Sequence, residues 1–142
     1  MEHKVKNSRP ISRNERRDIR RQNQLGSFLE YDGLPGWQLC EVRPQSLRIV
    51  HDDFRGEPLI KGELIETTVN RIRSRIDADD FPFSDQIRQR WTNKSPVYVL
   101  RTRHNGELYV YDGQKRTFNA CYNADEWMPA LLVDVDEERE VI

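Results

Sequence analysis

One stripe of apolar side chains recurs at intervals of four, three and four residues, which places it on a single face of a helix. It consists of Ile65, Val69, Ile72 and Ile76. The spacing predicts a helix over residues 62–76 that packs this face against a core. Short, largely apolar runs typical of strands cover residues 37–42, 46–50 and 129–135. A short helix is expected to pass through Ile87, and residues 51–58 are expected to form a loop.

A hairpin is the clearest local prediction. Residues 97–103 and 107–111 are rich in β-branched and aromatic side chains, and Asn105-Gly106 lies between them. An Asn-Gly pair flanked by two such runs is the strongest short signal for a β-hairpin. Asp112-Gly113 closes the second strand, and a helix that carries Phe118 and Cys121 inward is expected to begin at once.

The N-terminal region has a helix signal but little apolar content. Ser12 and Glu15 have the spacing of a capping box, and Gly26 is a natural stop, so a helix is expected over residues 13–25. Its arginines follow spacings of three, one, three and one, which puts them along one stripe. They are Arg13, Arg16, Arg17, Arg20 and Arg21. The helix is either a solvated surface element or a basic arm that contacts nucleic acid or a partner.

Composition limits the class of protein. The 142 residues are 36% hydrophobic and 33% charged with a net charge of −1, which excludes a uniformly basic nucleic-acid coat. The charge is nevertheless uneven, because residues 1–22 are mostly basic and residues 125–142 mostly acidic. No apolar run approaches the roughly 18 residues that cross a bilayer, and no secretory signal follows Met1. Two cysteines, Cys40 and Cys121, fit neither a disulfide scaffold nor a zinc pattern. A cytoplasmic protein without a membrane partner is expected.

The chemically informative stretch is Asp112-Gly113-Gln114-Lys115-Arg116, where a strand enters a helix through glycine. The first N–H groups of a helix lack internal acceptors and favour anions, phosphate above all. Gly113 would let a phosphate approach the backbone, and Lys115 and Arg116 would balance its charge. Asp112 could cap the helix, hold a metal ion or position a water. The alternative is an ordinary turn with an N-cap.

The order of strand, Asn-Gly turn, strand, Asp112-Gly113-Gln114-Lys115-Arg116, helix and apolar strand resembles the core of the ParB/sulfiredoxin superfamily. Gly113 to Arg116 is similar to the Gly-Glu-Arg-Arg turn of ParB proteins. It is closer still to the Asp-Gly-Gln-Gln-Arg signature of NTP-hydrolysing domains in phage-defence and DNA-modification systems. The resemblance covers residues 97–135 well, 47–76 loosely and 1–40 not at all. In this superfamily the loop after the first strand approaches the nucleotide, so His51-Asp52-Asp53 is either an ordinary polar loop or part of the site.

Two departures from the superfamily narrow the expected activity. Gln114 occupies the position of the sulfiredoxin cysteine, so reduction of a sulfinic acid is not expected. The chain ends too soon for the helix-turn-helix domain of ParB proteins, so recognition of a centromere sequence is not expected either.

The expected fold is therefore α/β of the α+β type, a small mixed sheet with packed helices in residues 41–142, preceded by a basic arm and linker in residues 1–40. The resemblance implies a nucleotide-binding protein, either an NTPase or a DNA-nicking enzyme of phage or mobile-element type. The alternative is a catalytically silent module that binds DNA or a protein partner. The expected ligand is an NTP, ATP or CTP, held by Gly113, Gln114, Lys115 and Arg116, with Mg²⁺ and catalysis assigned to Asp112. DNA or RNA is expected to meet the arm, and a protein partner or a homo-oligomer is a further option.

Overall fold

A mixed sheet with helices stacked on it forms the body of this computed structural model, which describes residues 3–15, 17, 38–90 and 95–136. Within these residues, six strands form the main sheet in the order β1-β2-β8-β6-β7-β3. They are β1 (Val5–Pro10), β2 (Gln38–Val42), β3 (Leu47–Ile49), β6 (Val97–Thr102), β7 (Leu108–Asp112) and β8 (Met128–Val135). The pairs β6–β8 and β3–β7 are parallel, and the remaining pairs are antiparallel. The expected α+β architecture is confirmed.

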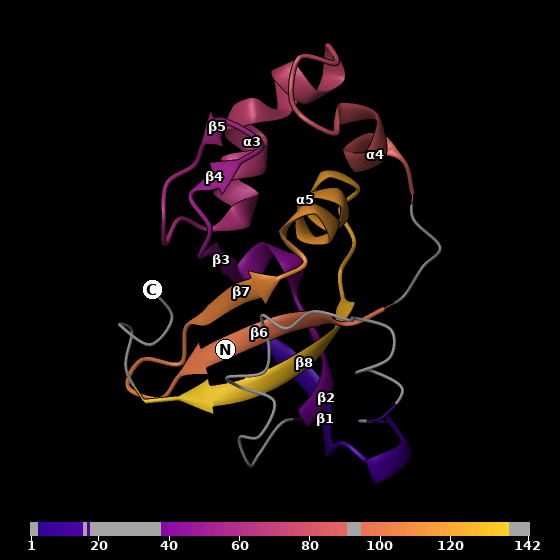
Figure 1. The fold of residues 1–142 in the computed structure, drawn as a ribbon, viewed down its shortest axis with the longest axis vertical. Coiled ribbons are helices and arrows are strands. Elements are labelled where there is room, and N and C mark those ends of the chain that lie inside the picture. The colour runs from indigo at the N-terminus through magenta and orange to yellow at the C-terminus, as the bar shows by residue number, and fades with distance from the viewer. Residues whose placement is uncertain (1–2, 16, 18–37, 91–94, 137–142) are drawn as a thin grey trace.

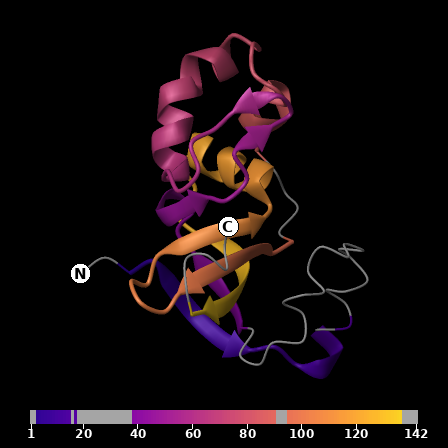
Figure 2. The same ribbon diagram turned by 60° about the vertical axis from the view of Figure 1, so that its left-hand side comes forward.

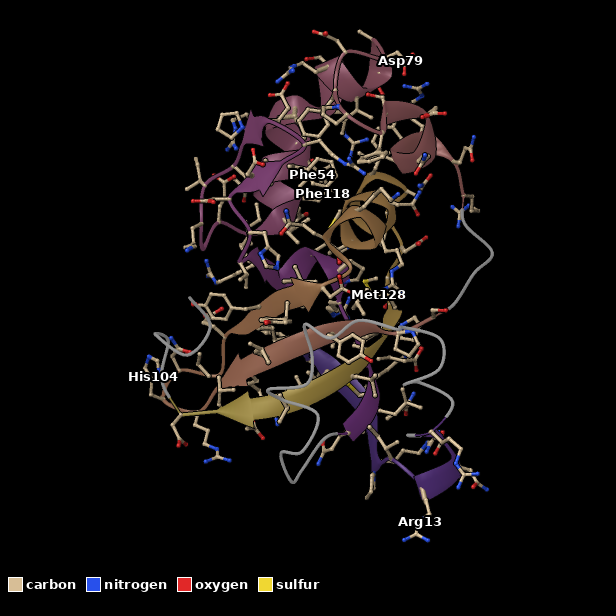
Figure 3. The ribbon with its side chains drawn as sticks, viewed as in Figure 1. Arg13, Phe54, Asp79, His104, Phe118 and Met128 are labelled. Atoms are coloured by element: carbon tan, nitrogen blue, oxygen red, sulfur yellow. The ribbon has the colours of Figure 1, made fainter. Side chains whose placement is uncertain are left out.

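The helices gather on one side of the sheet, as both views show (Figures 1 and 2). They are α3 (Ile65–Asp77), α4 (Ser84–Arg88) and α5 (Gln114–Tyr122), with the short 3-10 helix η2 (Pro44–Ser46) beside them. The predicted stripe of α3 faces the core, since Ile65 and Ile76 are fully buried and Val69 and Ile72 nearly so. Phe118 of α5 packs against Phe54 with ring centroids 5.1 Å apart, and both rings are labelled in Figure 3.

The central strands β6 and β8 are apolar over most of their length because both faces of the sheet are buried there. Val97 and Val99 of β6 belong to the core beneath the helices. Tyr98 and Leu100 point the other way and belong to a second apolar cluster with Leu131 of β8. Successive side chains of a strand alternate between faces, so a strand covered on both sides reads as a continuous apolar run.

The predicted hairpin is confirmed, with β6 and β7 antiparallel. Gly106 adopts φ +71°, a left-handed conformation that glycine allows without strain. The Asn105 side-chain oxygen accepts a 2.9 Å hydrogen bond from the amide of Glu107 and a second bond from the Thr102 hydroxyl. The turn therefore uses Asn105 for its hydrogen bonds and Gly106 for its backbone conformation.

Two segments differ from the sequence-based expectation. Residues 51–58, expected to be a loop, contain a small hairpin of β4 (Asp53–Phe54) and β5 (Glu57–Pro58), which turns through Arg55 and Gly56 at positive φ. Its strands are too short to show an alternating pattern. Residues 5–10, expected to belong to the arm, form β1, the edge strand paired with β2. This strand is largely polar and exposed, so it carries no apolar signal.

The start of the basic helix has the predicted capping box. The Ser12 hydroxyl accepts a 3.1 Å hydrogen bond from the amide of Glu15, and the Glu15 carboxylate accepts one of 3.2 Å from the amide of Ser12. The Arg9 guanidinium of β1 donates two hydrogen bonds, of 2.7 and 2.5 Å, to the same carboxylate. The expected helix over 13–25 falls mostly outside the described residues. None of the helices in the described ranges has the length and apolarity needed to cross a membrane.

Candidate functional site

The turn from β7 into α5 has the geometry expected of a strand that enters a helix through glycine. Asp112 ends the strand, and Gly113 caps the helix at φ +104° and ψ +26°. A Cβ built on Gly113 would lie 2.4 Å from Cγ1 of Val97, the first residue of β6. Glycine is therefore required here by its backbone conformation and by the close approach of β6, reasons that hold with or without a ligand.

Arg116 lies at the third position of α5 and turns toward the segment that precedes β6. Its Nη1 donates hydrogen bonds of 2.7 Å to the carbonyl oxygen of Ser95 and 3.1 Å to that of Pro96. Its Nη2 lies 4.0 Å from a carboxylate oxygen of Asp112, and 19% of the Arg116 side chain is exposed. Burial lowers the pKa of Arg116, and the Asp112 charge opposes that shift. A guanidinium stays protonated in proteins, so this site holds a largely buried positive charge.

Gln114 is the first residue of α5, and its side chain connects the turn between β7 and α5 to the loop after β3. Its Nε2 donates a 3.1 Å hydrogen bond to the carbonyl oxygen of His51, while Nε2 of His51 lies 2.8 Å from the carbonyl oxygen of Tyr111. His51 is thus brought to the candidate site. The Gln114 side-chain oxygen is buried and has no hydrogen-bond partner among the described residues. A buried acceptor of this kind calls for a donor from water or a ligand.

Lys115 points in a different direction from Arg116. Its ammonium donates a 2.7 Å hydrogen bond to the side-chain oxygen of Gln86 on α4 and lies 4.3 Å from the ring centroid of Phe83. The sequence predicted that Lys115 and Arg116 would meet at one phosphate site. In the structure Lys115 turns toward α4, and Arg116 turns toward the start of β6. Both are held by contacts within the chain.

A pocket of about 540 Å³ lies on the Arg116 side of α5. Arg116, Asn119 and Ala120 form its helical wall, at the i, i+3 and i+4 spacing of a single helix face. Asn119 is also structural, because its amide donates 2.9 and 3.0 Å hydrogen bonds to the carbonyl oxygens of Ile87 and Gln86 in α4.

Most of the other residues that line the pocket come from the β-sheet. β1 contributes Asn7 and Arg9, and β2 contributes Leu39, Cys40 and Glu41. Trp127, just before β8, and Met128 and Pro129, its first two residues, add apolar side chains to the lining. Figure 3 labels Met128 where β8 begins, between the sheet and the helices. None of these residues carries a motif, so their contribution could not be recognised before their strands were paired.

Asp112, assigned to catalysis and metal binding, ends β7 at 4.0 Å from the Arg116 guanidinium, and 37% of its side chain is exposed. It is not among the described residues that line the pocket. In the part of the chain that the structure describes, no group of three or more His, Cys, Asp or Glu side chains gathers in a way that could hold a metal ion. The metal and catalytic roles of Asp112 stay predictions.

The arginines assigned to nucleic-acid binding are only partly within the described residues. Arg13 and Arg17 are exposed, and Figure 3 shows Arg13 at the far end of the molecule from α3. Arg16, Arg20 and Arg21 lie outside the described residues, so the expected stripe stays a prediction.

Comparison of the chain with protein-family models, with curated proteins and with solved structures gives no match in any of the three.

Proposed function

We propose that this protein binds a nucleotide and that Arg116 contacts its phosphate. The observation that carries the proposal is the placement of the Arg116 guanidinium, which is largely buried and lines a pocket of about 540 Å³. Among the described residues, the nearest carboxylate oxygen in an ion pair with it is that of Asp112, at 4.0 Å. Pockets of roughly 300–1,000 Å³ are the usual size for small-molecule ligands.

The electrostatics of this position favour an anion. Arg116 stands in the first turn of α5, where the positive end of the helix dipole disfavours a cation. Its two hydrogen bonds go to the carbonyl groups of Ser95 and Pro96, which are neutral. A phosphate beside the guanidinium would gain a charge-assisted hydrogen bond in a site partly shielded from water.

The resemblance to the ParB/sulfiredoxin superfamily supports a nucleotide in particular. Asp112-Gly113-Gln114 and Arg116 match the signature of NTP-hydrolysing domains, and they lie in a strand–glycine–helix context. Hydrolysis is the second part of the proposal: Asp112 would hold Mg²⁺ or orient a water, with ATP or CTP as the substrate. Binding and hydrolysis are separable, so each has its own test.

Binding is tested by thermal shift and then calorimetry with ATP, CTP, GTP and ADP, with and without Mg²⁺. We expect Arg116→Ala to weaken nucleotide binding by about 10- to 100-fold, the scale of one charge-assisted hydrogen bond. Arg103→Ala is the matched control, because Arg103 is exposed on the hairpin turn and pairs with Asp136 at 2.6 Å.

Arg116→Lys is a second variant, which keeps the positive charge available to a phosphate and removes the guanidinium that hydrogen-bonds the carbonyl groups of Ser95 and Pro96. Its melting temperature without ligand reports whether the domain is intact. Unchanged affinity in a folded Arg116→Ala protein, or no binding of any nucleotide at millimolar concentration, would refute the proposal.

A further inference from the structure

The edge strand β1 has little apolar contact with the rest of the domain. Val5 packs against the core beneath the helices, and the five residues that follow it are exposed. Burial of apolar surface is the main force that holds an element in a fold, so a strand with one partly buried apolar side chain is weakly held. Just beyond the strand, Ile11 packs against the second apolar cluster and keeps the chain attached there.

The backbone pairing of β1 with β2 is also interrupted. Between Lys6 and Arg9 the register shifts, and β1 takes one more residue than β2 does. Asn7, within the shift, has φ +56°, a left-handed conformation that is uncommon outside glycine. An extra residue of this kind is left unpaired, and Pro10 has no N–H to donate. The strand therefore makes fewer backbone hydrogen bonds to β2 than its length allows.

Polar side chains supply much of what joins β1 to its neighbours. Lys4 Nζ lies 3.5 Å from the Glu107 carboxylate, and Lys6 Nζ lies 4.4 Å from the ring centroid of Trp127. The side-chain amide of Asn7 donates a 2.6 Å hydrogen bond to Glu41. Exposed contacts of this kind are individually weak, and salt screens those that involve charges. They allow the strand to leave its place at a small cost in free energy.

The same strand contributes to the pocket beside Arg116. Asn7 and Arg9 are among the residues that line it, and so is Trp127, which Lys6 contacts. Departure of β1 would remove two lining residues and uncover one face of the Trp127 ring. A ligand that touches these residues binds the paired strand better than the detached one, and it therefore shifts the strand toward the paired state.

We propose that β1 is a strap, Val5–Pro10, which leaves the edge of the sheet and returns as a unit while the rest of the domain stays folded, and that a ligand in the pocket holds it in place. The opening follows from the contacts of β1 and is independent of the proposed function. The effect of a ligand rests on the proposed function, since the ligand is the nucleotide whose phosphate contacts Arg116.

Native-state hydrogen exchange, measured by NMR at increasing urea concentrations below the unfolding transition, tests the opening. We expect the protected amides of β1 to exchange at least about 100-fold faster than those of β8, with a weaker dependence on urea. Lys6→Met removes the charge and keeps a long side chain, so it should speed β1 exchange by roughly two- to fivefold. Lys6→Arg should restore the wild-type rate, and β8 exchange should stay unchanged in both variants.

Lys61→Met is the matched control, because Lys61 is exposed between β5 and α3 and outside β1. Rising salt should speed β1 exchange in the wild type and do so less in the Lys6→Met protein. Equal exchange rates in β1 and β8, with the same dependence on urea, would overturn the strap. The polar edge would then serve only to discourage pairing with strands of other chains.

The effect of a ligand is tested by repeating the exchange with ATP or CTP, whichever binds in the thermal-shift screen. Saturating nucleotide should slow β1 exchange by at least about tenfold, because the ligand binds the paired strand preferentially. Unchanged β1 exchange with nucleotide bound would overturn this coupling and leave the opening intact. Absence of nucleotide binding would overturn the proposed function and the coupling together, while exchange without ligand still decides whether β1 opens.

Discussion

Arg116 and Asp112 are separated by one turn in sequence, and Nη2 of the arginine lies 4.0 Å from Oδ2 of the aspartate. The guanidinium directs its Nη1 hydrogen bonds to the carbonyl groups of Ser95 and Pro96 and leaves the carboxylate at the edge of contact range. A carboxylate at this distance attenuates the positive charge without neutralising it. A phosphate bound at Arg116, as we propose, would therefore compete with Asp112 for the guanidinium.

Replacing the carboxylate with its neutral isostere is expected to strengthen anion binding. Asp112→Asn should tighten the binding of a nucleotide or of inorganic phosphate by roughly 2- to 5-fold, a small effect because Asp112 is partly exposed and the interaction is screened. Calorimetry at low and high salt measures it, and the gain should shrink as salt rises. Weaker binding by the folded Asp112→Asn protein would instead show that the carboxylate supports the ligand.

Any hydrolysis should depend on the same carboxylate. Asp112→Ala is expected to abolish release of inorganic phosphate from an NTP in the presence of Mg²⁺, while nucleotide binding persists. A phosphate-release assay checks this. Undiminished turnover by the variant would remove Asp112 from the reaction, and no turnover by the wild type would favour the catalytically silent alternative.

Gly113 is expected to be the least replaceable glycine of the described chain. Gly113→Ala should destabilise the protein by about 2–4 kcal/mol, because a side chain at φ +104° is strained and its Cβ would overlap the buried Val97. Gly56→Ala is the matched control, since Gly56 has φ +89° but no atom within 4 Å of the added Cβ. It isolates the strain, at about 1 kcal/mol. Urea unfolding of both variants measures the difference, and equal losses would contradict the packing explanation.

The two buried cysteines are expected to make the protein less stable at alkaline pH. Burial raises the pKa of Cys40 to about 11 and that of Cys121 to about 12, from an ordinary value of 9.0. In the unfolded chain both thiols lose their protons above pH 9, while in the folded protein they stay neutral, so the unfolded state gains stability as pH rises. We expect a loss of about 2–4 kcal/mol between pH 8 and 10.5.

Urea unfolding across that pH range provides the test, with Cys40→Ala/Cys121→Ala as the control. The double variant should be less stable at pH 8 because it loses buried volume, yet its stability should depend less on pH. Identical pH slopes for the two proteins would contradict a role for the thiols.

The basic helix is expected to bind nucleic acid in a salt-dependent manner. Replacement of five arginines by alanine should abolish binding to duplex DNA at low salt; they are Arg13, Arg16, Arg17, Arg20 and Arg21. For the wild type, the logarithm of the binding constant should fall linearly with the logarithm of the salt concentration, with a slope of about −0.9 per phosphate neutralised. Substitution is preferable to deletion of residues 1–22, because Val5–Pro10 is a strand of the sheet. No gel shift by the wild type with DNA or RNA would favour a protein-docking role for this helix.

Local interactions account for what could be predicted from the sequence. The stripe of α3, the Asn105-Gly106 turn and the reciprocal Ser12–Glu15 bonds each depend on residues a few positions apart. Their geometry follows from helical spacing, turn chemistry and capping, whatever the rest of the chain does. The strand–glycine–helix arrangement around Gly113 was predictable for the same reason, because few residues other than glycine adopt its φ of +104° readily.

The tertiary structure decided where the functional groups point. β1 is polar and exposed, so its place in the sheet comes from its hydrogen bonds to β2 and not from an apolar pattern. Arg116 and Lys115 are adjacent in sequence, yet their side chains point in different directions. Arg116 donates hydrogen bonds to the carbonyl groups of residues 95 and 96, and Lys115 donates one to Gln86. The pocket likewise joins β1, β2, α5 and the start of β8. Helical or strand periodicity determines which face of an element a side chain occupies, but the partner across that face comes from a distant part of the chain and exists only once the elements are packed.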